Sequence, residues 1–271
     1  MFMRVSTDLL VGVRLALRAR FVLISFCGLL LLLVAATLGA QFSGRQPATV
    51  ALDVGVSVIR FVLPVVAVLL LQELLSREFD RRLHLSSLTY PRPRCVFLLG
   101  RFAAIALLSL ILLIVLAAAL AALVGWVGRA YEQATPPSLG LPYVLTLALV
   151  ALDLSVVLAI GTLLGVFAST SGFVLLGSLG FMLVARSYGN VVALLQLDTT
   201  LVVHAGTYQS SLSLLGYLLP DLGALDVRMI TLYDSFEFLP ADLGWRVVAA
   251  LAYSLALFAL AVWTLDRRNF S

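Results

Sequence analysis

The chain has 271 residues, of which 62% are hydrophobic and 12% are charged, and its mean hydropathy is +1.10. A soluble domain carries about twice that share of charged residues, so this composition cannot cover a water-facing surface. It excludes a soluble enzyme and a disordered chain, and it predicts an all-α, polytopic membrane protein.

The basic residues are all arginine, because the chain has 18 arginines and no lysine. A pI of 9.4 would indicate nucleic-acid binding in a soluble protein, whereas in a membrane protein arginine first reports orientation. Without lysine the chain lacks both a Schiff-base lysine and the phosphate loop that ends in Gly-Lys-Ser/Thr. We therefore expect no nucleic-acid partner and no ATP hydrolysis by this chain itself.

The chain opens with an amphipathic segment, residues 4–20. At 100° per residue, Leu9 and Val13 share one helix face while Arg14 and Arg18 share another. Such a helix lies in the membrane interface, with its arginines near anionic lipid headgroups. The alternative is a polybasic flank to the first membrane span.

Six apolar runs follow that are long enough to cross about 30 Å of hydrocarbon, which takes roughly 20 residues. They lie at residues 21–40, 54–75, 102–127, 141–168, 173–195 and 245–265. The first run is too long for a cleaved signal peptide, so we expect it to be retained. The end of the fifth run is open, because Ala185 is too early for a full span and Leu195 requires the burial of Arg186.

Two connecting stretches are longer than simple turns. Residues 76–101 join the second and third runs, and residues 196–244 precede the last run. The later stretch mixes short apolar pieces with turn residues such as Pro220 and Gly223. We expect short re-entrant or interfacial helices there rather than a further span.

Arginine is unevenly distributed between the two sides that six spans define. Both termini lie on one side, which holds twelve of the 18 arginines, while five lie on the other side and one lies within a span. The larger group consists of Arg4, Arg14, Arg18, Arg20, Arg77, Arg81, Arg82, Arg92, Arg94, Arg101, Arg267 and Arg268. By the positive-inside rule, both termini and residues 76–101 are predicted to be cytoplasmic.

Residues 76–94 begin with a helical pattern. Glu78 and Arg82 are spaced i,i+4, and Pro91 disfavours helical geometry in the residue before it. A short, charged helix with leucines on one edge suits docking into a groove on a cytoplasmic partner. The alternative is an ordinary solvated loop that its arginines keep inside.

This stretch resembles the loop between the second and third spans of type-2 ABC exporter permeases. The resemblance is carried by Glu78, Arg81-Arg82-Leu83, Leu88-Thr89-Tyr90-Pro91, Arg94 and Leu98-Leu99-Gly100-Arg101. The family's loop has an acidic residue, a basic-Gly-Thr step, a leucine-rich part, Pro-x-x-Arg and Leu-x-Gly-Lys. Here Arg81-Arg82 stands where the Gly-Thr step is expected, and Arg101 replaces the lysine. The amphipathic start, the six spans, the outside region before the last span and the basic tail also match the family.

The resemblance implies the permease subunit of an ATP-driven exporter in the bacterial inner membrane. Such a subunit pairs with itself or a homologous permease and with two cytoplasmic ABC ATPase subunits, which hold ATP and Mg²⁺. The loop helix docks on the ATPase and passes its closing motion to the spans. By resemblance, the ATPase-coupling residues are Glu78, Arg81, Arg82 and Leu83, while Pro91 and Arg94 shape the return to the membrane.

Arg60 and Asp153 are ionisable residues within predicted spans, where a charge is costly and is a functional candidate by default. Arg60 is about 10 Å from the outer end of its run, close enough to snorkel to the surface, whereas Asp153 is near mid-depth. One hypothesis is that Arg60 and Asp153 pair across the second and fourth spans and brace the bundle. The other is a proton relay through Asp153 in a secondary carrier.

The remaining sequence patterns give weaker indications of function. The two cysteines and two histidines are too far apart in the sequence for a disulfide framework or a zinc site, and no hydrolase or metalloprotease motif is present. We therefore expect no catalytic residue, metal or cofactor in this chain. Gly161 and Gly165 have the small-x-x-x-small spacing that is typical of close helix packing.

The function that the sequence favours is export of an amphiphilic substrate, or its extraction from the membrane, because few charges fall within the spans. Two alternatives stay open, a secondary carrier and a non-transporting membrane scaffold of an envelope assembly machine. Membrane lipids are expected partners, and residues 196–244 offer a surface to a periplasmic partner.

Overall fold

The structure is a computed structural model that describes residues 2–18, 21–76, 94–130, 136–168, 170–197 and 219–267. Within these residues there is no strand, and six helices are long and apolar enough to cross a membrane. The chain is therefore an all-α polytopic membrane protein, as the sequence predicts.

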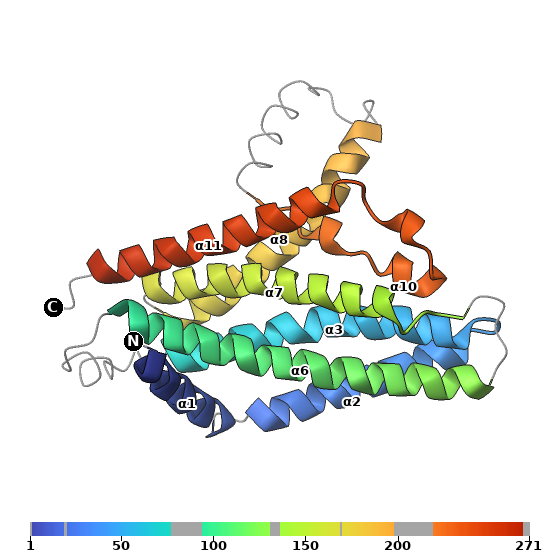
Figure 1. Ribbon diagram of the computed structural model, residues 1–271, viewed down its shortest axis with the longest axis horizontal. Coiled ribbons are helices and arrows are strands. Elements are labelled where there is room, and N and C mark those ends of the chain that lie inside the picture. The colour runs from blue at the N-terminus through green and yellow to red at the C-terminus, as the bar shows by residue number, and fades with distance from the viewer. Residues whose placement is uncertain are drawn as a thin grey trace.

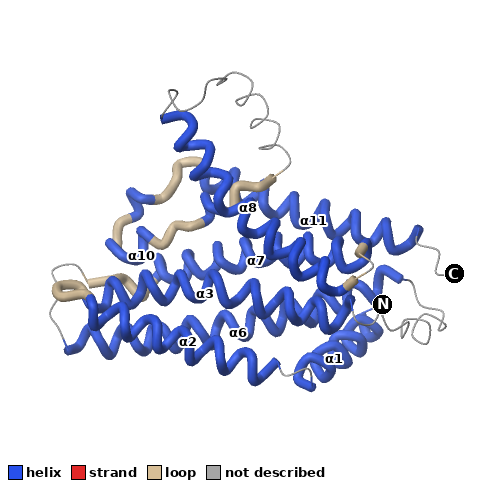
Figure 2. The backbone as a smooth tube through the Cα atoms, turned by 180° about the vertical axis from the view of Figure 1, so that it is seen from behind, coloured by secondary structure: helices blue, strands red, loops and turns tan. Residues whose placement is uncertain are grey.

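The long helices from α2 onward follow one another in alternating directions (Figure 1). The first part of the chain contains α1 (Phe2–Arg18), α2 (Phe21–Phe42), α3 (Pro47–Leu71) and the π-helical turn η1 (Gln72–Ser76). The middle contains α6 (Arg94–Ala130), α7 (Leu141–Phe167) and α8 (Ser171–Leu197). The last part contains η3 (Gly223–Leu225), α10 (Met229–Tyr233), η4 (Phe236–Phe238) and α11 (Leu243–Arg267). Both termini lie at the end of the bundle that carries α1, and α10 lies toward the opposite end (Figures 1 and 2).

Helix α3 is the centre of the bundle. It packs against α2, α6, α7 and α8, and 67% of its most apolar stretch is buried, compared with 11% for α11. Leu52, Ile59, Leu63 and Leu71 of α3 are fully buried. A displacement of α3 would therefore change its packing contacts with four of the other five spans, α2, α6, α7 and α8.

The start of α3 differs from the predicted span of residues 54–75. The helix begins at Pro47, because proline is favoured in the first turn of a helix, and it continues through Asp53. The charge of Asp53 sets the N-terminal limit of the apolar run in the sequence, whereas in the fold this carboxylate lies inside the helix and forms an ion pair with Arg228. Arg60 is therefore about 20 Å from the start of its helix rather than about 10 Å.

The predicted loop of residues 76–101 is too long at its C-terminal end. Helix α6 begins at Arg94, directly after Pro93, and Arg101 lies within it rather than at a membrane boundary. Arg101 is only 7% exposed, so it does not snorkel to the surface, and its guanidinium lies 5.5 Å from the ring centre of Phe97. With 37 residues, α6 is about 55 Å long and exceeds the thickness of the hydrocarbon core.

The other predicted boundaries are close to the observed ones. The predicted spans at residues 173–195 and 245–265 correspond to α8 and α11, which extend about two residues further at each end. Within residues 196–244 the described part contains the short helices η3, α10 and η4, in agreement with the prediction of short helices before the last span. Gly161 and Gly165 permit the predicted close packing, because a Cβ on Gly165 would lie 2.8 Å from Leu75 Cδ2.

Helix α1 is amphipathic, as predicted, and packs across the first part of α6. Its small residues Gly12 and Ala16 are buried, while Leu10 and Leu17 are about half exposed. A Cβ on Gly12 would lie 2.8 Å from Ala104 Cβ and 3.5 Å from Arg101 Nη1. The close packing of α1 against α6 therefore requires a glycine at residue 12, because the methyl group of Ala104 leaves no room for a side chain.

We predict that Gly12→Ala lowers the stability of the chain by about 1–3 kcal/mol, because the new methyl group overlaps Ala104 Cβ. The measurement is the unfolding of the detergent-purified protein, and Gly125→Ala on α6, where nothing lies within 4 Å of the new Cβ, is the control. The double variant Gly12→Ala/Ala104→Gly should recover most of the loss. Equal effects of Gly12→Ala and Gly125→Ala would contradict this packing.

Candidate functional site

A polar stripe lies on one face of the central helix α3. Asp53, Ser57 and Arg60 are spaced i, i+4 and i+7, which places them above one another along the helix. Arg228, which lies just before α10, joins this stripe: its Nη1 is 2.9 Å from Asp53 Oδ1 and 2.6 Å from Ser57 Oγ. The stripe therefore connects α3 to the segment of residues 219–233, which we call the cap segment.

Asp153 is the most deeply buried charge of the site, with 1% of its side chain exposed. It extends from the middle of α7 and forms a close ion pair with Arg186 of α8. Arg60 Nη2 lies 3.8 Å from the same oxygen, Asp153 Oδ2. A carboxylate in an apolar bundle is costly unless cations compensate it, so these two arginines allow it to remain charged.

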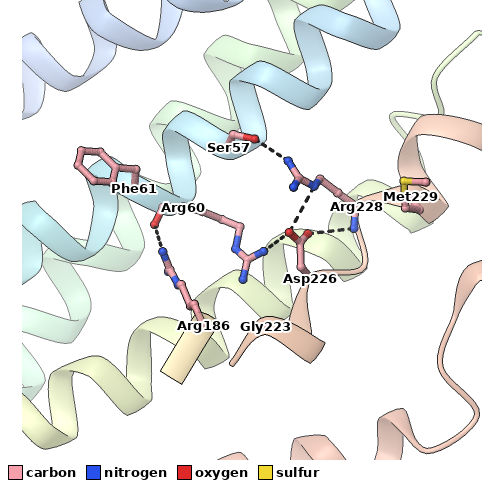
Figure 3. Close-up of a pocket in the computed structure, with 8 residues that line it drawn as sticks. All are labelled: Ser57, Arg60, Phe61, Arg186, Gly223, Asp226, Arg228 and Met229. Atoms are coloured by element: carbon pink, nitrogen blue, oxygen red, sulfur yellow. Dashed lines mark hydrogen bonds and ion pairs between the residues drawn. The ribbon is translucent and has the colours of Figure 1, made fainter. Parts of the chain in front are cut away.

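Arg60 and Arg186 are also linked through the backbone. Arg186 Nη1 donates a hydrogen bond of 2.8 Å to the carbonyl oxygen of Arg60, as Figure 3 shows. Arg60 Nη2 donates to the carbonyl oxygen of Leu222 at 3.4 Å. The two guanidinium groups are therefore fixed by α3, α7, α8 and the cap segment together.

Asp226 is the carboxylate that the cap segment contributes. It forms a close ion pair with Arg60 Nη1 and lies 3.3 Å from Arg228 Nε, so it is placed between the two arginines (Figure 3). Asp53, Asp153 and Asp226 balance Arg60, Arg186 and Arg228, and we call these six residues the ion cluster. Their formal charges cancel, which allows the cluster to persist inside a membrane-spanning bundle.

The cap segment approaches α8 closely beside the cluster. Leu222 N donates to the carbonyl oxygen of Ala185 at 3.2 Å, and a Cβ on Gly223 would lie 2.6 Å from the carbonyl oxygen of Arg186. Only glycine fits at residue 223 without displacing the backbone. On the other side, Thr231 Oγ1 lies 2.8 Å from Thr146 Oγ1 of α7.

A cavity of about 540 Å³ opens beside the ion cluster. It lies between α3, α8 and the cap segment, and its lining is shown in Figure 3. The lining residues are Ser57, Arg60, Phe61, Arg186, Gly223, Asp226, Arg228 and Met229. The cavity is therefore bordered by charged groups on one part of its wall and by large apolar side chains on another.

The structure brings together the two charges that the sequence singles out, but each has a closer partner. Arg60 and Asp153 are 3.8 Å apart, as the bracing hypothesis requires, while Asp226 is closer to Arg60 and Arg186 is closer to Asp153. Of the two roles open to Arg60, snorkelling and pairing, the structure shows pairing, because its side chain is 11% exposed and forms ion pairs.

Sequence reasoning missed four members of the site. Asp53 stood at the edge of an apolar run, Asp226 and Arg228 lay in a stretch predicted to be outside, and Arg186 was assigned to the outer side. A signal existed for two of them: Arg186 is enclosed by apolar residues, and Asp53 continues the helical spacing of Arg60.

Of the six predicted ATPase-coupling residues, the structure describes one, Arg94. Five of them lie outside the described residues: Glu78, Arg81, Arg82, Leu83 and Pro91. Arg94 is the first residue of α6, where the chain re-enters the bundle. Among the described residues no group of three or more histidine, cysteine, aspartate or glutamate side chains is arranged to hold a metal ion.

Comparison with protein-family models gives no match to this chain, and comparison with curated proteins gives none either.

We predict that Asp153→Asn lowers the free energy of unfolding by about 3–5 kcal/mol, because it removes the only carboxylate that Arg186 contacts among the described residues. The measurement is equilibrium unfolding of the purified chain in mixed micelles of neutral detergent and dodecyl sulfate.

The matched control is Asp242→Asn, which breaks the exposed i,i+4 pair with Arg246 and should cost about 0.5 kcal/mol or less. Adding Arg186→Gln to Asp153→Asn should recover part of the loss, because the unpaired buried cation is then removed. If Asp153→Asn and Asp242→Asn destabilise the chain equally, Asp153 does not hold the helices together.

Proposed function

We propose that the chain is the transmembrane subunit of a type-2 ABC exporter, driven by a separate cytoplasmic ATPase. The observation that carries the proposal is that α1 contacts the two elements that flank residues 77–93 in the sequence. Helix α1 contacts both η1, from which this stretch departs, and α6, to which it returns. Residues 78–91, which carry most of the resemblance to the family's coupling loop, are therefore flanked in the sequence by two elements that α1 contacts.

This arrangement supports a route for mechanical coupling. A force on residues 77–93 reaches α3 through η1 and reaches α6 at Arg94. Helix α3 carries Arg60, about 18 Å along the helix from Gln72, so a rigid displacement of α3 moves its side of the ion cluster. The ATP and Mg²⁺ chemistry belongs to the partner ATPase, two copies of which would serve a pair of permease subunits.

The proposed orientation places the α1 end of the bundle in the cytoplasm of a bacterial inner membrane. Both termini lie at that end (Figure 1), and the arginine asymmetry favours it as the inner side. The ion cluster and the cap segment would then lie toward the periplasmic side.

A secondary carrier with a proton relay is less well supported. A relay needs a chain of groups that take up and release protons, whereas the charged partners of Asp153 among the described residues are two arginines, which stay protonated. A scaffold that does not transport would also be braced by such a cluster, so the two remaining functions are separated by their dependence on an ATPase.

We predict that ATP hydrolysis co-purifies with the affinity-tagged chain from its native membranes, is inhibited by orthovanadate, and is lost in Arg81→Glu/Arg82→Glu. Reversal of these charges should break the docking of the loop on an ATPase, and each lost charge-assisted contact is worth about 1.5–3 kcal/mol. The measurement is hydrolysis per purified chain, with mass spectrometric identification of the co-purified subunit by its Gly-x-x-x-x-Gly-Lys-Ser/Thr loop.

Arg129→Glu is the matched control, because Arg129 is exposed and lies at the opposite end of α6. It should retain the ATPase. Purification without any ATPase would favour a scaffold instead, and an ATPase that stays bound to Arg81→Glu/Arg82→Glu would contradict docking through these two arginines.

A further inference from the structure

The walls of the cavity carry more positive than negative charge, although the ion cluster as a whole is neutral. Arg60, Arg186 and Arg228 line the cavity, but of the three carboxylates only Asp226 does so. Asp153 is buried behind it in α7, and Asp53 is at the edge of α3. A molecule inside the cavity therefore meets three guanidinium groups and one carboxylate, which favours an anion.

Arg228 has hydrogen-bond donors left for such an anion. A guanidinium carries five N–H groups, and within the described residues Arg228 uses only Nε and Nη1, for Asp226, Asp53 and Ser57. Its Nη2 is therefore available, and its side chain is 34% exposed. The planar fork of a guanidinium matches the oxygens of a phosphate group, which it can bind through two parallel hydrogen bonds.

The remaining part of the lining is apolar and exposed. Phe61 is 58% exposed and Met229 is 42% exposed, and Figure 3 places them on two sides of the charged residues. Phe61 follows Arg60 in the middle of a membrane-spanning helix, where an exposed aromatic ring meets hydrocarbon. A ligand that satisfies the whole cavity therefore carries an anionic group on a hydrocarbon body.

We propose that this cavity binds the phosphate-bearing headgroup of an anionic amphiphile. Arg60 and Arg228 contact the phosphate, while Phe61 and Met229 contact the adjoining hydrocarbon. A volume of about 540 Å³ is in the range of small-molecule sites and accommodates a phosphate with a short polar substituent. That the amphiphile is the exported substrate rests on the proposed function, whereas the binding site itself does not.

The experiment measures ligand binding to the purified full-length chain in a neutral detergent by native mass spectrometry. The probes are phosphatidylglycerol, phosphatidylcholine of the same chain length, and inorganic phosphate. We expect phosphatidylglycerol to bind about tenfold more tightly than phosphatidylcholine, and Arg228→Gln to remove about tenfold of that affinity, as the loss of one charged hydrogen bond would.

Arg246→Gln is the matched control for Arg228→Gln. Arg246 is 33% exposed and lies close to two aspartates, Asp221 and Asp242, but it does not line the cavity. It should bind phosphatidylglycerol like the unmodified chain. Equal affinity for the two lipids, or equal effects of the two arginine variants, would overturn the proposal.

A second pair of variants tests the site without touching the ion cluster. Met229→Glu places a negative charge at the cavity and should weaken phosphatidylglycerol binding more than Met229→Gln, which removes only the apolar contact. Indistinguishable affinities of these two variants would also overturn the proposal, even if Arg228→Gln fails to fold.

Inorganic phosphate separates the two sources of the anion. Displacement of phosphatidylglycerol only by a large excess of phosphate supports an amphiphile, as does weaker lipid binding by Phe61→Ala. If free phosphate binds as tightly as the lipid and Phe61→Ala has no effect, the amphiphile assignment is wrong. None of these measurements needs an ATPase, so the permease proposal can fail while the binding site stands, and the converse also holds.

Discussion

The charge of Asp153 imposes the main constraint on this bundle. Apolar contacts distinguish poorly between a neighbouring helix and lipid, so in a membrane they do not by themselves determine which helices pair. A carboxylate at the middle of α7 requires cations, and Arg186 and Arg60 supply them from two different helices. Once those arginines are in place, Arg60 requires Asp226, and the cap segment is held against α3 and α8. One buried charge therefore sets the relative positions of four parts of the chain.

The central position of α3 connects this cluster to the other end of the molecule. The helix is buried along most of its length and carries the polar stripe near one end and η1 at the other. Helix α1 packs on α6 and contacts η1. At this end of the bundle, α1 therefore joins α6 to the C-terminal end of α3, as the cap segment joins α3 to α8 at the ion cluster. In the proposed coupling, η1 and α3 link residues 77–93 to the cavity, so the coupling and binding proposals concern one mechanical path.

Much of the fold could be predicted from the sequence because membrane spans are set by the length of apolar runs. The six spans and the amphipathic start follow from that rule, while the boundaries at Pro47 and Arg94 do not, since helices continue past the hydrocarbon. Arg60 and Asp153 stood out because a charge in an apolar run is rare. Asp226 and Arg228 could not be recognised, because their contacts with α3 span more than 160 residues of sequence and require the cap segment to fold back.

The central claim is that the ion cluster holds the cap segment on the bundle, and a disulfide test addresses it directly. Thr146 and Thr231 have oxygens 2.8 Å apart, so Thr146→Cys/Thr231→Cys should form a disulfide when Cys27 and Cys95 are replaced by serine. The number of free thiols is counted by the gel shift after reaction with maleimide–polyethylene glycol. The account predicts an efficient disulfide that is largely lost when Asp226→Asn is added and kept when Asp242→Asn is added. A disulfide that never forms, or that Asp226→Asn leaves unchanged, would contradict it.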